Sequence, residues 1–92
     1  MVDRLFIPRK GDPPGGRLEG WLRRGVQGGV FAALPPYSPP GGRWDYRPEP
    51  YARGLLARLR AAADDPSALE RVKDDGRAFR SWAEAVLLAV AG

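Results

Sequence analysis

The chain has 92 residues, enough for one small domain with a single core. It contains no cysteine and no histidine, which excludes a disulfide scaffold, zinc sites built from those side chains, and catalysis by Cys-His or Ser-His-Asp arrangements. The net charge of +4 comes mostly from arginine, and the basic excess lies in residues 1–60, whereas residues 61–92 are slightly acidic. Arginine suits phosphates and carboxylates, but codon usage in a GC-rich genome would produce the same excess.

The first residues have the composition of a short strand. Met1–Pro8 contains several apolar residues, and Pro8 would stop further pairing in a sheet. Arg9–Gly16 follows as a loop, because two prolines and flanking glycines suit neither a helix nor a central strand. A second strand of the sheet is then needed further along the chain.

A short helix is predicted over Arg17–Arg24. Leu18, Trp21 and Leu22 have helical spacing, and Gly25 is placed to cap the C-terminal end. Because glycine at position 20 weakens a helix interior, an irregular turn or a strand stays open as an alternative.

The next part of the chain is rich in glycine and proline. Gly29–Leu34 is predicted to be the short strand that pairs with the N-terminal one. Pro35–Pro50 holds six prolines in 16 residues, which favours extended structure and turns. This segment is therefore interpreted as an extended arm.

The C-terminal part has the strongest helical pattern. A helix is predicted from Pro50 to Ala63, and Asp65 followed by proline indicates the start of another over Pro66–Lys73. A third is predicted over Arg77–Ala91, with one long helix from Pro66 through Gly76 as the alternative.

These elements together predict one α+β domain over residues 1–92. A short β element and Gly/Pro-rich loops in residues 1–50, including the arm over 35–50, would pack on two or three helices in residues 51–92. The sequence has no apolar segment of about 20 residues that could span a bilayer. We therefore expect a soluble protein of the cytoplasm or of an intracellular or viral assembly, with no membrane partner.

Aromatic and arginine side chains are interleaved in the second half of the arm, which indicates either a binding surface or aromatic side chains that simply anchor the loop to a small core. Trp, Tyr and Arg dominate protein interfaces, and the same residue types stack on bases and hold phosphates. The favoured interpretation is a non-enzymatic protein-binding or assembly protein, whose partner is another protein or a second copy, with no metal or cofactor. The alternative is a basic nucleic-acid-binding accessory protein. The candidate interface residues are Tyr37, Trp44, Tyr46 and, off the core face of the last helix, Leu88. The candidate nucleic-acid contacts are Arg23, Arg24, Arg43, Arg47, Arg53 and Arg60.

Overall fold

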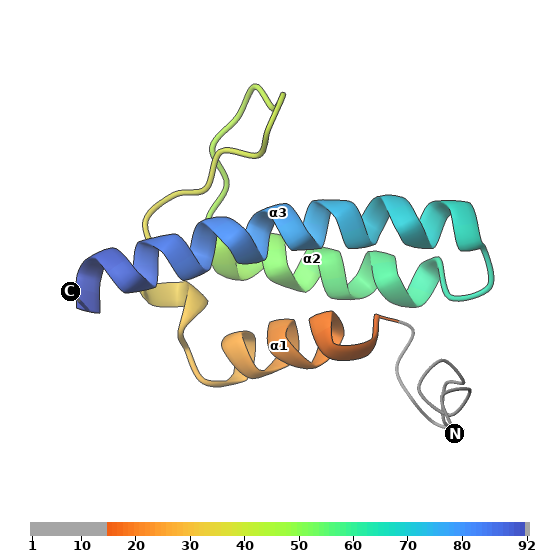
Figure 1. The fold of residues 1–92 in the computed structure, drawn as a ribbon, viewed down its shortest axis with the longest axis horizontal. Helices are drawn as coiled ribbons and strands as arrows, with labels where there is room; N and C mark the ends of the chain where they lie inside the picture. Colours follow the sequence, from red (N-terminus) through yellow and green to blue (C-terminus); the bar gives the residue numbers. More distant parts are fainter. Residues whose placement is uncertain (1–14, 92) are drawn as a thin grey trace, which may run out of the picture.

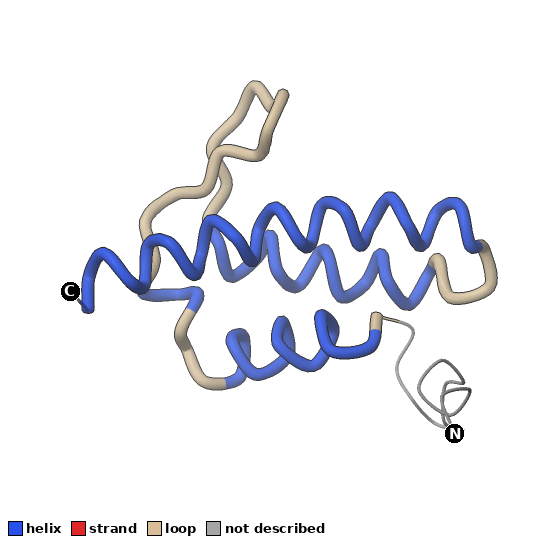
Figure 2. Tube along the Cα trace, viewed as in Figure 1, coloured by secondary structure: helices blue, strands red, loops and turns tan. Residues whose placement is uncertain are grey.

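The computed structural model describes residues 15–91, which form three α-helices and one turn of 3-10 helix (Figure 1). The elements are α1 (Gly16–Gln27), η2 (Phe31–Ala33), α2 (Pro48–Ala61) and α3 (Pro66–Ala91). The helices α2 and α3 lie side by side and antiparallel, and α1 packs against them (Figures 1 and 2). The predicted α+β class is therefore wrong, since the part of the chain described here is an all-helical small domain.

The strand predicted over Gly29–Leu34 is replaced by the turn η2. Gly29 has a φ of +75°, a left-handed conformation that glycine adopts without cost, and the N–H of Val30 donates to the carbonyl of Gly25 at 3.0 Å. The chain thus reverses at the end of α1, which returns the ring of Phe31 to the core, where it is 1% exposed. The strand predicted over Met1–Pro8 lies outside the described residues.

The core is built around an aromatic side chain on α3. Phe79 is fully buried, and its ring lies 5.1 to 6.0 Å, centroid to centroid, from five other aromatic rings. Those rings belong to Trp21, Phe31, Tyr37, Tyr51 and Trp82. Contributions therefore come from all three helices, from η2 and from the arm, which explains how a chain with so many loop residues buries a core.

Two glycines lie inside helices at positions that leave no room for a side chain. Gly25, predicted as a cap, is a buried residue of α1, and a Cβ there would fall on the ring of Phe31. Gly76 lies within α3, where a Cβ would come within 2.6 Å of Leu18 Cδ2. Both positions need glycine because another side chain packs directly on the helix backbone.

The start of the last helix follows the prediction, and its continuation follows the stated alternative of one long helix through Gly76. Asp65 Oδ1 accepts a hydrogen bond from the N–H of Ala68 at 3.2 Å, the interaction expected of an N-cap carboxylate. Instead of two helices, α3 continues unbroken through Gly76 to Ala91. Asp75, just before Gly76, pairs with Arg58 of α2 at 2.8 Å. Although α3 has 26 residues, no helix in the described range is apolar enough to cross a membrane.

Candidate binding loop and arginine groove

The arm forms a closed loop that projects from the helices (Figure 1). Tyr37 and Tyr46 exchange two backbone hydrogen bonds, each 2.8 Å between nitrogen and oxygen, so that residues 37–46 make a hairpin-like loop. We call this segment the arm loop. Its ends are held by backbone pairing, and the preceding and following residues join it to η2 and α2.

The tip of the arm loop is a tight turn that the sequence specifies. The N–H of Gly42 donates to the carbonyl of Pro39 at 2.9 Å, and Gly41 has a φ of +73°. Proline followed by a left-handed glycine is the sequence signature of a type II turn. Below the tip, the hydroxyl of Ser38 donates to the carboxylate of Asp45 across the loop. The loop conformation is therefore fixed at the base, in the middle and at the tip.

The predicted interface residues of the arm differ in how far they are exposed to solvent. Tyr37 is 2% exposed and packs between the rings of Phe79 and Trp82, so it anchors the loop in the core. Tyr46 is 41% exposed and lies against Tyr51 at 5.5 Å between ring centroids. Trp44 is 70% exposed. The loop thus buries Tyr37, presents Trp44 to solvent and leaves Tyr46 partly exposed.

Leu88 lies apart from the arm loop, on the C-terminal part of α3. It is 74% exposed, and Val90 is 80% exposed. The reason is that α3 extends past the end of α2 (Figure 1). Its last turns therefore have no neighbouring helix to cover them within the described residues.

The anchoring tyrosines give the fold a dependence on alkaline pH. Burial raises the pKa of Tyr37 above its ordinary value, with a further contribution from the negative charge of Asp75. Burial also raises the pKa of Tyr51, next to Tyr37. Because the folded state holds these protons more tightly than the unfolded state, the contribution of these two hydroxyls to stability should be fully present below about pH 10 and be lost above it. Urea denaturation of the wild type and Tyr37→Phe at pH 8 to 11 would test this. The variant should lose less stability at high pH, and equal losses would contradict the prediction.

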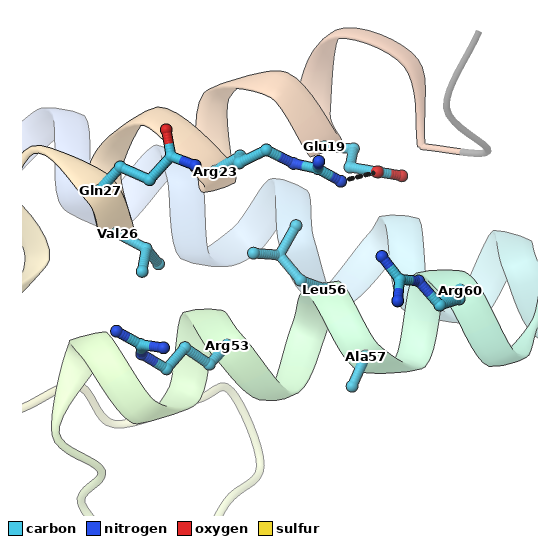
Figure 3. A pocket seen from close by; sticks show the side chains of 8 residues that line it. All are labelled: Glu19, Arg23, Val26, Gln27, Arg53, Leu56, Ala57 and Arg60. Carbon is cyan, nitrogen blue, oxygen red and sulfur yellow. Dashed lines mark hydrogen bonds and ion pairs between the residues drawn. The ribbon is translucent and has the colours of Figure 1, made fainter. Parts of the chain in front are cut away.

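A second feature is an open groove between α1 and α2, with a volume of about 650 Å³ (Figure 3). Each helix contributes a stripe of residues three or four positions apart, which places them on one face. The stripe of α1 is Glu19, Arg23, Val26 and Gln27, and that of α2 is Arg53, Leu56, Ala57 and Arg60. We call this feature the arginine groove.

The charges in the arginine groove differ in how firmly they are held. Glu19 is a buried carboxylate that pairs with Arg23 at 2.6 Å and accepts the N–H of Gly15 at 3.3 Å. Arg53 makes a longer ion pair with Glu49, at 3.6 Å. Arg60 makes no ion pair with any of the residues described. The groove therefore contains one fixed arginine and two that are available to a ligand.

The predicted nucleic-acid residues are brought together only in part. Arg23, Arg53 and Arg60 line the arginine groove, whereas Arg47 lines a separate cavity beside Tyr51 and Arg58. The remaining two, Arg24 and Arg43, are exposed on α1 and on the arm loop. Sequence reasoning missed the apolar floor of the groove, made by Val26, Leu56 and Ala57, because the stripe that contains it is recognised only when α1 is paired with α2.

Comparisons with protein-family models, with curated proteins and with solved structures found no match. In the range that the structure covers, the acidic side chains form no cluster of three or more that would hold a metal ion.

Proposed function

We propose that this chain is a non-enzymatic protein-binding domain and that the arm loop is its contact surface. The observation that carries the proposal is the exposure of Trp44, which is 70% accessible on a loop whose other features keep it in one conformation. A large exposed aromatic side chain on a rigid support is typical of the residues that dominate the energy of protein interfaces.

The architecture of the arm loop supports this function because it lowers the entropy cost of binding. The Tyr37–Tyr46 pairing and the turn at Gly41 hold the backbone before a partner arrives. Affinity increases when a contact loop is ordered in advance, since less conformational freedom is lost on association. The energy from burying the indole of Trp44 is then available for binding.

The charge around Trp44 indicates the chemistry of the partner surface. Arg43 and Arg47 are both exposed near it in sequence, while Asp45 is engaged by Ser38 within the loop. The matching surface is an apolar slot for the indole, flanked by carboxylates. Another protein and a second copy of this chain both remain candidates, and they are distinguished by the experiment below.

The test is to compare the proteins retained by the immobilised wild-type chain with those retained by two variants, using lysate of cells that produce it. Trp44→Ala should lose the specific partner, with a loss of binding free energy of about 2 kcal/mol or more. Val30→Ala should retain it, because this control removes an exposed apolar side chain that lies outside the arm loop and is no candidate for the interface. Treating the lysate with nuclease separates protein-mediated from nucleic-acid-mediated capture.

Three outcomes are decisive for this function. Capture that Trp44→Ala leaves unchanged would contradict the proposal, and capture lost after nuclease treatment would support the nucleic-acid alternative instead. If no partner is retained, sedimentation of the wild type and Trp44→Ala shows whether the chain associates with itself. Self-association that depends on Trp44 would identify a second copy as the partner, and a monomer in both cases would overturn the proposal.

A further inference from the structure

We infer that the arginine groove is a second binding site, separate from the arm loop, and that it accepts an acidic amphipathic helix of a protein partner. The inference depends on the geometry and charge of the groove and not on Trp44. The groove runs between two antiparallel helices (Figure 3). Two such helices present a channel that a third helix fills in the packing of helical bundles.

The spacing of the lining residues fits a helix rather than a compact ligand. On α2, Arg53 and Arg60 are seven residues apart, which corresponds to about 10.5 Å along the helix axis. Leu56 and Ala57 lie between them, one turn from each. A partner helix with apolar residues in its centre and two carboxylates seven positions apart would match this pattern.

The floor of the groove distinguishes a helix from a nucleic acid. Val26 and Leu56 are partly buried and already pack against the core, so the floor is an apolar surface continuous with the core. Among residues 15–91, no aromatic side chain lines the groove, although aromatic stacking is what single-stranded nucleic acids normally find in their sites.

The ion pairs in the groove define where partner carboxylates would bind. Glu19 already neutralises Arg23 with a 2.6 Å contact, so this arginine contributes little net charge. Arg53 has only a long, exposed pair with Glu49, an interaction that is weak and readily exchanged. Arg53 and Arg60 are therefore the two positive side chains available to partner carboxylates, one toward each end of the apolar floor.

The probe is a designed helical peptide with leucines at a spacing of three and four residues and two glutamates seven positions apart. A control peptide has lysine in place of both glutamates. Binding to the full chain is measured by fluorescence anisotropy, with a labelled mixed-sequence DNA oligonucleotide as a third ligand. We expect the glutamate peptide to bind with a dissociation constant below about 100 µM and the lysine peptide to bind at least about tenfold more weakly.

Three variants locate the site. Arg60→Glu should weaken binding of the glutamate peptide about tenfold or more, whereas Arg71→Glu, with the same charge change at an exposed position of α3 outside the groove, should change it less than about twofold. Combining Arg60→Glu with Arg53→Glu should reverse the preference in favour of the lysine peptide. Ala57→Trp fills the floor without changing charge and should weaken the peptide by a similar factor.

The result that overturns this inference is equally specific. It fails if neither peptide binds below about 100 µM, if Arg71→Glu weakens binding as much as Arg60→Glu, or if only the oligonucleotide binds and does so in an Arg60-dependent way. Circular dichroism of each variant shows that the helices are intact. Since Trp44→Ala should leave peptide binding unchanged, failure of this site and failure of the arm loop are distinguishable.

Discussion

Replacing Phe79 by alanine should lower the free energy of unfolding by about 3 to 5 kcal/mol, the range found for buried aromatic residues. The ring is fully buried and contacts aromatic rings from every described element of the fold. Domains of this size are stable by only about 5 to 15 kcal/mol. The variant should therefore lose a large part of its stability, as measured by urea denaturation followed by circular dichroism.

Two matched substitutions show whether the loss arises from the aromatic cluster. Phe79→Leu keeps most of the volume and should cost less, about 1 to 2 kcal/mol. Leu88→Ala removes an apolar side chain that is 74% exposed and should change stability by less than about 0.5 kcal/mol. A cost below about 1 kcal/mol for Phe79→Ala would show that this ring is not the centre of the core.

The position of Phe79 also connects stability with the proposed function. Its ring contacts Tyr37, and Tyr37 forms one side of the pairing that closes the arm loop. Loss of the ring would loosen this anchor and thereby the support of Trp44. The core and the arm loop are thus one structural unit, although a projecting, proline-rich loop suggests an independent segment.

The helices could largely be predicted from the sequence, because local patterns determine them. The spacing of Leu18, Trp21 and Leu22 predicts α1, and the Asp65-Pro66 pair predicts the beginning of α3. The Pro-Pro-Gly-Gly run likewise favours a turn in the arm loop. The assignment of Gly25 as a helix cap was wrong, because local propensity cannot show whether another side chain packs on the backbone at that position.

The two candidate binding sites could be predicted to different degrees, because one lies within a single segment and the other is formed by two helices. Trp44 could be named as a candidate from the sequence because Trp, Tyr and Arg side chains interleaved in a loop are typical of protein interfaces. The arginine groove was not, because residues of α1 and α2 that are about 30 positions apart meet only in the tertiary structure. Its three arginines were recognised as charges, but their arrangement around an apolar floor depends on the pairing of the two helices.

Replacing Gly25 should also change the stability of the fold strongly. Gly25→Ala should lower the free energy of unfolding by about 1 to 3 kcal/mol, even though alanine favours helices more than glycine does. The added methyl group would fall on the ring of Phe31, which is 1% exposed and packs against Phe79. The ring cannot withdraw without disturbing the aromatic cluster. Thermal and urea denaturation give the change directly.

The chain contains its own control for helix propensity. Gly54 lies within α2, is exposed, and has no atom within 4 Å of the position that a Cβ would occupy. Gly54→Ala should therefore raise the free energy of unfolding by about 0.5 to 1 kcal/mol.

Adding Phe31→Leu to Gly25→Ala should make the two changes less costly together than their separate effects predict, because the smaller side chain leaves room for the methyl group. If Gly25→Ala instead stabilises the chain as Gly54→Ala does, the ring of Phe31 does not rest on the backbone of α1, and the turn through η2 must pack differently.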